Sequence, residues 1–354
     1  MSHRGSTIDR RAFLKLGAAA SGLAIGCGAE GPESEAPAAP GRMGSRPLGR
    51  TGLEVSTISL GSWLTFGGSV DEPTSIECIH RALDIGVNFF DTADIYEAGR
   101  AEEVVGRALT TLPRERVIVG TKVFFPTGTG QGLGRTHVLA ECEASLRRLG
   151  LEVIDLYQCH RYDPSTVLEE TCRVMHDLIQ AGKIRHWGVS EWTADQMADV
   201  VALCEREGLT SPATDQPRYS MLQRGVEGEV LPTCARLELG VVAFSPLAQG
   251  VLTGKYRRSD KRPRGSRAAD PSGASFIQPF LSRGNLARID RLRPIASGLG
   301  LTLGQVALAW VLRRPEVTSA IIGATELAHI DENVAAADVD LDAETLDAIE
   351  RALV

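Results

Sequence analysis

The feature that most constrains the fold is an alternation of short β-rich segments with longer segments of helical spacing. Eight short segments follow one another, at residues 56–63, 86–93, 116–122, 153–160, 184–190, 212–216, 240–245 and 318–323. Strands that alternate with helices run parallel and are buried on both faces. Eight such units fit a closed (β/α)₈ TIM barrel, which leaves no free sheet edge. We therefore predict a single α/β domain of this type over residues 46–354.

A doubly wound parallel sheet would show the same alternation. That fold normally places a GxGxxG motif directly after its first strand, and no such motif follows residues 56–63. The nearest match, GTGQGLG at residues 128–134, follows the third β-rich segment with different spacing, so we interpret it as a loop. Helical spacing is clear at residues 75–86, 101–112, 137–150, 167–182 and 303–314. Glycines close three of these segments, as they do at helix ends: Gly86, Gly150 and Gly182.

Composition excludes some classes of function. The chain of 354 residues is 43% hydrophobic with a formal net charge of -7, which is typical of a globular protein and gives no broad attraction to a phosphate backbone. We therefore expect no nucleic-acid partner. The seven cysteines include no CxxC pair, so neither a metal site nor a dithiol motif is predicted.

The amino-terminal residues differ in character from the rest. Residues 1–27 resemble a twin-arginine export signal, with Arg10 and Arg11 before a short apolar segment, and Cys27 ends a sequence similar to a lipoprotein processing site. The alternative is an accidental arginine pair before an alanine-rich helix. Residues 28–45 have the composition of a flexible linker. We expect export to the periplasm or a lipid anchor at a membrane surface, with a cytoplasmic location as the alternative.

Polar side chains or glycines stand where the predicted strands end. In a barrel of this type the active site forms at the carboxyl ends of the strands. Function should therefore be sought at one rim, among Trp63, Asp91, Lys122, His160, Ser190, Gln216, Ser245 and Gly323.

Lys122 is the most informative of these positions. Its ammonium group lies in the apolar run VIVGTKVFF, where an unpaired charge is costly, and Asp91 ends the neighbouring strand. We expect an ion pair, for which a purely structural role is the alternative. Tyr96 follows Asp91 by five residues, and we expect the nearby ammonium to lower the pKa of its hydroxyl and make it a general acid.

His160 ends the strand that carries Gln158 and Cys159. Strand alternation places the His160 side chain on the same side as Gln158 and turns Cys159 the opposite way, so Cys159 is a poor candidate nucleophile. A single histidine is more often structural than catalytic. On the same rim as Tyr96, however, His160 is positioned to hydrogen-bond a substrate carbonyl.

Several motifs resemble those of the aldo-keto reductases, and especially the branch that contains the potassium-channel β subunits. They are FFDTADIYEAGRAEEVVGRAL, TKVF, DLYQCHR, GVSEW and SPLAQGVLTGKY, in the family's order and at the ends of successive strands. The resemblance implies a reductase in which a nicotinamide cofactor delivers hydride to an aldehyde or ketone and Tyr96 donates the proton. Lys122 and Asp91 would tune Tyr96, and His160 would orient the carbonyl. Asparagine is common at the last position in the channel subunits, so histidine favours a working reductase.

The resemblance also implies a set of cofactor-binding residues. Lys255 and Arg267 match the family residues that grip the 2′-phosphate of NADP, which favours NADPH over NADH. Phe244 stands where the branch often has tryptophan. Its phenyl ring can still stack on the nicotinamide. The full set is Ser62, Trp63, Ser190, Gln216, Phe244, Ser245, Pro246, Leu247, Gly250, Lys255, Arg267, Gly323, Thr325, Glu332 and Asn333.

A second class of function is consistent with the same residues. The chain would then be a nicotinamide-binding regulatory subunit of a membrane protein with little or no turnover. The identity of the carbonyl substrate is set by loops whose shape the sequence does not reveal, and the oligomeric state, including a homo-oligomer, stays open.

Overall fold

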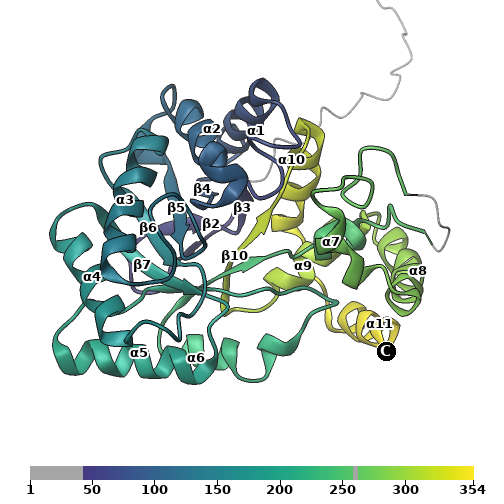
Figure 1. The fold of residues 1–354 in the computed structure, drawn as a ribbon. Helices are drawn as coiled ribbons and strands as arrows, with labels where there is room; N and C mark the ends of the chain where they lie inside the picture. Colours follow the sequence, from purple (N-terminus) through teal and green to yellow (C-terminus); the bar gives the residue numbers. More distant parts are fainter. Residues whose placement is uncertain (1–42, 258–261) are drawn as a thin grey trace, which may run out of the picture. The chain divides into compact units, whose positions relative to one another are not determined.

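A computed structural model describes residues 43–257 and 262–354. The sheet is a closed barrel of parallel strands in the order β10-β3-β4-β5-β6-β7-β8-β9, with helices around it (Figure 1). Each of the eight predicted segments overlaps one barrel strand, so the predicted fold class is confirmed. The strands are β3 (Ile58–Gly61), β4 (Phe89–Asp91), β5 (Ile118–Val123), β6 (Ile154–Cys159), β7 (Ile184–Ser190), β8 (Thr214–Gln216), β9 (Gly240–Phe244) and β10 (Val317–Ile322).

The five predicted helical segments all contain helices. Gly86, Gly150 and Gly182 have left-handed φ values of 99°, 64° and 68°, which fits their predicted role at helix ends. Thr193 and Thr302 each begin a helix with a capping box. The helices are α1 (Glu72–Asp84), α2 (Arg100–Leu109), α3 (Arg135–Leu149), α4 (Leu168–Gln180), α5 (Ala194–Glu207), α6 (Val230–Arg236), α7 (Ala274–Ile277), α8 (Arg283–Gly298), α9 (Leu303–Leu312), α10 (Leu327–Val334) and α11 (Ala343–Leu353).

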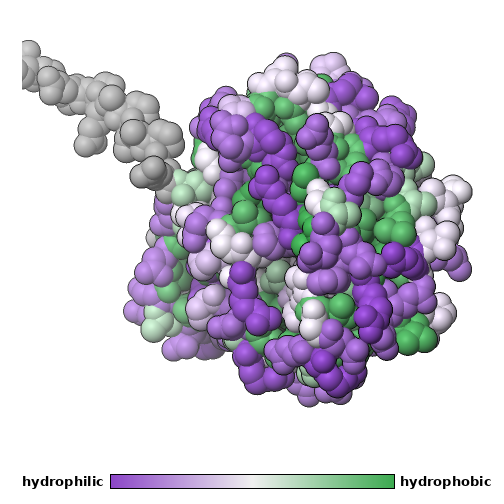
Figure 2. Space-filling view, turned by 90° about the vertical axis from the view of Figure 1, so that its left-hand side faces the viewer, coloured by the Kyte–Doolittle hydropathy of each residue, from purple (hydrophilic) through white to green (hydrophobic). Residues whose placement is uncertain are grey.

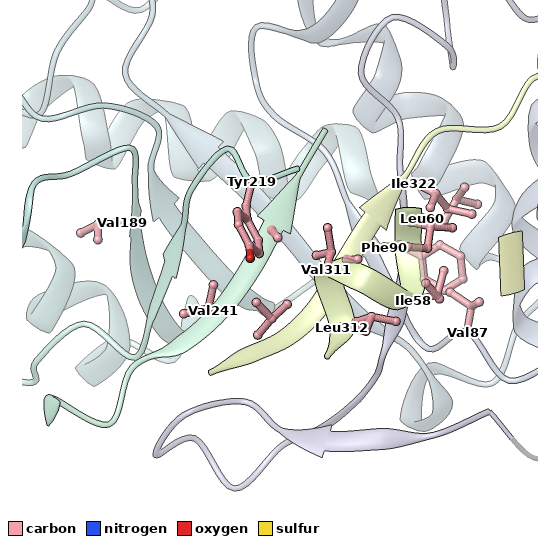
Figure 3. Close-up of a cluster of buried hydrophobic side chains, with 14 of the residues drawn as sticks. Ile58, Leu60, Val87, Phe90, Val189, Tyr219, Val241, Val311, Leu312 and Ile322 are labelled. Carbon is pink, nitrogen blue, oxygen red and sulfur yellow. The ribbon is translucent and has the colours of Figure 1, made fainter. Parts of the chain in front are cut away.

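The strands separate two groups of buried apolar side chains. The larger group lies between the strands and the helices, and Figure 3 shows part of it, including Leu60, Phe90 and Ile322. The smaller group fills the barrel and includes Phe89, the immediate neighbour of Phe90, because successive side chains of a strand point to opposite faces. Its other barrel members are Ile118, Leu156, Val242 and Ile321.

An antiparallel hairpin that the sequence did not reveal closes the amino end of the barrel. Strands β1 (Ser45–Pro47) and β2 (Glu54–Ser56) form it, and Leu48 and Val55 belong to the apolar group inside the barrel. A Cβ on Gly49 would lie 2.5 Å from the Ala213 carbonyl oxygen, which shows how closely the turn packs beneath β8. Met43 also packs against the core. These residues, Met43 to Ser45, fall within the segment expected to be linker.

Few large apolar side chains of the described residues are exposed. Figure 2 shows one face on which hydrophilic residues predominate and apolar residues form small, scattered groups. Over residues 43–257 and 262–354, no single helix has both the length and the apolar composition to cross a membrane, and the pair α8 and α9 meets the test only jointly, with a bend of 91°. The predicted export signal and the Cys27 site lie outside the described residues.

Close packing of α2 on α3 gives a test of the fold. A Cβ on Gly106, in α2, would lie 2.6 Å from the backbone oxygen of Leu149, whereas a Cβ on Gly298, in α8, would meet no atom within 4 Å. We expect Gly106→Ala to reduce the free energy of unfolding by about 1–3 kcal/mol, because backbone must shift to make room. Gly298→Ala should leave it unchanged or raise it by up to about 1 kcal/mol. Urea denaturation of both variants tests this, and equal stabilities would contradict it.

Candidate active site

The predicted rim residues converge because their strands are neighbours. Asp91 is the last residue of β4 and pairs in register with Gly120 of β5, two residues before Lys122. Lys122 pairs with Gln158 of β6, and His160 follows that strand. Asp91 and Lys122 lie on the same strand faces as Phe89 and Ile118, which fill the barrel. The carboxylate and the ammonium therefore form a polar layer directly above the apolar filling of the barrel.

The ammonium of Lys122 is fully buried and makes three polar contacts. Its Nζ lies 2.7 Å from Asp91 Oδ2, 2.7 Å from the Thr92 carbonyl oxygen and 3.5 Å from the Tyr96 hydroxyl. Burial lowers the pKa of Lys122, and the charge of Asp91 opposes that shift. The other oxygen of Asp91 accepts a 2.8 Å hydrogen bond from the Gln216 side-chain amide. The expected ion pair is thus present, and β8 supports it.

Tyr96 begins a short 3₁₀ turn, η1 (Tyr96–Gly99), in which Glu97 and Ala98 have left-handed φ values of 48° and 55°. The Lys122 Nζ lies 5.1 Å from the centre of the Tyr96 ring. The expected lowering of the Tyr96 pKa is wrong for this structure. Burial raises the pKa well above 10, and the nearby Asp91 carboxylate adds to the increase. The short contacts of the ammonium go to Asp91 and Thr92, so Tyr96 keeps its proton.

His160 lies beside Tyr96 with its ring in a mainly apolar setting. The ring centres of His160 and Tyr96 are 5.7 Å apart, and Phe125 packs edge-on against His160 with ring centres 4.9 Å apart. Burial and the positive charges of Lys122 and Arg161 lower the pKa of His160 well below 6.5, so its imidazole is neutral at neutral pH. Its Nδ1 has no hydrogen-bond partner among the described residues. Cys159 points outward into the core, as predicted, and burial raises its pKa.

A cavity of about 1020 Å³ opens above these side chains. Tyr96 and His160 line it, while Asp91 and Lys122 lie beneath its floor. Ser62 is also beneath it, because its hydroxyl donates to Thr92 Oγ1 at 2.9 Å. Every other residue expected to bind the cofactor lines this cavity: Trp63, Ser190, Gln216, Phe244, Ser245, Pro246, Leu247, Gly250, Lys255, Arg267, Gly323, Thr325, Glu332 and Asn333.

One wall of the cavity is a loop with unusual backbone conformations. Ser245, Gln249 and Gly250 have φ values of 55°, 60° and 89°, and the loop continues through the 3₁₀ segment η4 (Ala248–Thr253). Alternation of left- and right-handed residues turns backbone N–H groups into a concave surface suited to anions. Lys255 also lines this part of the cavity, and burial and the charge of Arg267 lower its pKa.

Several cavity residues were not predicted from the sequence. Phe276 is 44% exposed and packs edge-on against Trp63 with ring centres 4.9 Å apart. Arg161 and Arg218 also line the cavity. Their only sequence signal is position, since Arg161 follows His160 directly and Arg218 comes two residues after Gln216.

Asp94 is a buried carboxyl group two residues before Tyr96. Its backbone N–H donates to the Lys122 carbonyl, yet neither of its carboxyl oxygens has a hydrogen-bond partner among the described residues. Burial, assisted by repulsion from Glu102 and Glu141, raises the pKa of Asp94 from 3.8 to about 8. The native state therefore holds a proton at neutral pH that the unfolded chain releases.

This proton makes stability depend on pH. Because the folded pKa of Asp94 is above the unfolded value, the free energy of unfolding should fall as pH rises from about 4 to about 8, by up to about 1.4 kcal/mol per unit. We expect Asp94→Asn to remove most of that slope and to be more stable than the wild type at pH 8. Urea denaturation at several pH values measures it. Asp84→Asn, at an exposed position, is the control, and an unchanged slope in Asp94→Asn would contradict the assignment.

Known proteins are similar to this chain over most of its length. A probable voltage-gated potassium channel subunit beta from Arabidopsis thaliana is 41% identical over 302 residues, which are 84% of this chain and 92% of the relative. A protein of the same description from Oryza sativa is 41% identical over 303 residues, with the same coverage. A putative channel subunit beta from Schizosaccharomyces pombe is 40% identical over 303 residues, 83% of this chain and 88% of the relative.

These relatives correct one expectation. Export by the twin-arginine route, to the periplasm or to a membrane anchor, does not agree with them, because they come from two plants and a yeast and their names describe channel subunits. The predicted location depended on a short local resemblance in residues 1–27 and is wrong on this comparison, whereas the twin-arginine and lipoprotein interpretations themselves fall on residues outside the described part of the structure.

A protein-family model also matches most of the chain. Residues 57–354, from the strand that opens the barrel to the last residue, match the model of the Aldo/keto reductase family. That range contains the ion pair, Tyr96, His160 and the whole cavity wall. The chain belongs to the aldo/keto reductase family.

Proposed function

We propose that this protein is an NADPH-dependent oxidoreductase that reduces an aldehyde or ketone to an alcohol. The observation that carries the proposal is the buried Lys122–Asp91 pair, with a 2.7 Å contact, directly beneath Tyr96 at the floor of a cavity that His160 also lines. Membership of the aldo/keto reductase family supports an oxidoreductase in general terms.

The cavity suits a dinucleotide cofactor in shape and chemistry. It extends from the aromatic side chains of Trp63 and Phe244 to Asn333 near the end of α10. The left-handed loop that begins at Ser245 offers backbone N–H groups for a pyrophosphate. Reduced nicotinamide, when bound, supplies the hydride for the carbonyl carbon. The ring of Phe244 would hold its plane by stacking.

The chain's own residues would handle the proton and the developing charge. The raised pKa keeps Tyr96 protonated, so its hydroxyl donates a proton to the carbonyl oxygen as the alcohol forms. Lys122, 3.5 Å from that hydroxyl, stabilises the phenolate that remains. Asp91 holds the ammonium in place. The neutral imidazole of His160 donates a hydrogen bond that orients the carbonyl oxygen.

Lys255 and Arg267 favour NADPH over NADH. Both line the cavity, and the positive charge of Arg267 lowers the pKa of Lys255, so the two cations repel one another when nothing lies between them. A phosphate group between them would relieve that repulsion. NADPH has such a group on the ribose at its adenine end, and NADH lacks it.

A second candidate function follows from the relatives. Three of them are named as subunits of voltage-gated potassium channels, so this chain is also a candidate nicotinamide-binding regulatory subunit of a membrane protein. Tight NADPH binding, together with no turnover across a broad panel of aldehydes and ketones, would favour this function over the reductase.

Replacing the proton donor tests the reductase directly. We expect Tyr96→Phe to lower carbonyl-dependent NADPH oxidation by at least about 100-fold, because general acid catalysis contributes that much, while the Kd for NADPH changes little. Tyr162→Phe is the control, since Tyr162 packs against Trp192 and does not line the cavity. The assay is NADPH absorbance, with fluorescence titration for binding. Unchanged turnover in Tyr96→Phe would remove Tyr96 from the mechanism.

The cofactor preference has its own test. We expect Lys255→Met to raise the KM for NADPH by roughly tenfold and to leave the KM for NADH nearly constant, since one charge-assisted contact to phosphate is lost. Arg264→Met, which removes an exposed charge from the same loop, should change neither value. Steady-state kinetics with both cofactors measure the effect. Equal changes for the two cofactors would show that Lys255 does not read the 2′-phosphate.

A further inference from the structure

Two arginines line the cavity on the side of the proposed proton donor. The charge of Arg161 acts on both Tyr96 and His160, since it lowers the pKa of each. Arg218 is close enough to Arg161 for its positive charge to lower the pKa of that guanidinium. The charges that act on Lys255 come instead from Arg267, Glu326 and Glu332. The Arg161 and Arg218 side chains are therefore a cationic pair separate from Lys255 and Arg267.

Neither guanidinium of this pair is neutralised by a direct contact. Among the described residues, no carboxylate oxygen lies within 4.0 Å of a guanidinium nitrogen of Arg161 or Arg218. Arg161 donates to the His160 carbonyl oxygen and lies over the Phe125 ring, with Cζ 5.6 Å from the ring centre. Arg218 lies over the Phe244 ring at 5.1 Å, and its Nε is buried without a hydrogen-bond partner. A buried donor left unsatisfied costs free energy that a ligand oxygen would recover.

Three carboxylates at or near the cavity, those of Glu191, Asp71 and Glu97, form no ion pair with either guanidinium group. Glu191 raises the pKa of Arg161, but its Oε1 accepts the backbone N–H of Arg218 at 2.7 Å. Of the acidic residues that line the cavity, Asp71 caps the first turn of α1. Glu97 packs its carboxyl group against Gly68, where a Cβ would lie 2.6 Å from Glu97 Cδ. Both guanidinium groups therefore line the cavity without a paired carboxylate.

We infer that the cavity selects carbonyl substrates that carry an anionic group, a carboxylate or a phosphate, and that Arg161 and Arg218 bind that group while the carbonyl lies at Tyr96 and His160. The inference rests on the proposed reductase function and adds a substrate class to it. Guanidinium groups match the planar oxygen pairs of both anions. Cation–π contacts with the rings of Phe125 and Phe244 help to hold the two guanidinium groups in place.

A matched set of substrates tests the inference on the intact protein. The set is 4-carboxybenzaldehyde, 4-formylphenyl phosphate and neutral 4-methylbenzaldehyde, each with saturating NADPH. We expect kcat/KM to be at least roughly tenfold higher for an anionic aldehyde than for the neutral one, mainly through KM. The advantage should shrink at high ionic strength. The better of the two anionic substrates identifies which anion the site accepts.

Variants test whether Arg218 is the source of the preference for anionic aldehydes. We expect Arg218→Gln to reduce the ratio of anionic to neutral kcat/KM by about tenfold, and Arg218→Lys to retain part of the preference, because the charge remains without the planar fork. Glu191→Gln keeps an oxygen for the Arg218 backbone N–H but removes a negative charge, so the ratio should rise. Arg206→Gln, at an exposed position on α5, is the control of equal charge change.

Failure of the anion site and failure of the reductase function would give different results. Equal kcat/KM for all three aldehydes, or a ratio that Arg218→Gln leaves intact, would overturn the anion site while the reductase function stands. No reduction of any aldehyde by a protein that binds NADPH would overturn the reductase function and the substrate class with it.

Discussion

The charge of Lys122 is the constraint on which the rest of the site depends. An ammonium with no exposure to water inside a barrel is tolerated only if it is paired and hydrogen-bonded. Asp91 supplies the countercharge, the Thr92 carbonyl takes a second N–H, and Gln216 from the far side of the barrel fixes the remaining carboxylate oxygen. Removing either charged partner would leave the other buried and unpaired. Strands β4, β5 and β8 must therefore keep their register for the contacts of Asp91, Lys122 and Gln216 to form. The same register also sets the positions of Tyr96 and His160.

Three titratable groups lie in or directly above this layer, namely Tyr96, His160 and Lys122. The surroundings of each group set its protonation state. Burial raises the pKa of Tyr96 and lowers the pKa of His160, and each change favours the neutral form. Lys122 is subject to the same burial, but Asp91 opposes the loss of its charge. The outcome is a neutral proton donor, a neutral hydrogen-bond donor and one paired cation within a few ångströms. Such separation of protonation states by local surroundings is how a site carries an acid and an electrostatic stabiliser at the same pH.

Much of this could be predicted from the sequence because the signals are local. Eight β-rich runs gave the barrel, and a lysine inside an apolar run required a partner that the neighbouring strand could supply. Other features depend on distances that no local pattern encodes. The direction of the Tyr96 pKa shift depends on burial and on the nearby Asp91 carboxylate. The Gln216 contact with Asp91 joins residues 125 positions apart, and Arg218 is placed by the same strand. The export prediction failed because it depended on a short motif outside the domain.

The hairpin formed by β1 and β2 closes the amino end of a barrel whose interior is filled by apolar side chains. It fills the amino end with Leu48 and Val55, so the interior communicates with solvent at the carboxyl end, where the cavity lies. Tyr96 and His160 are on the floor of that cavity. On the proposed function, cofactor and substrate therefore enter and leave through the same opening, at the carboxyl end of the barrel.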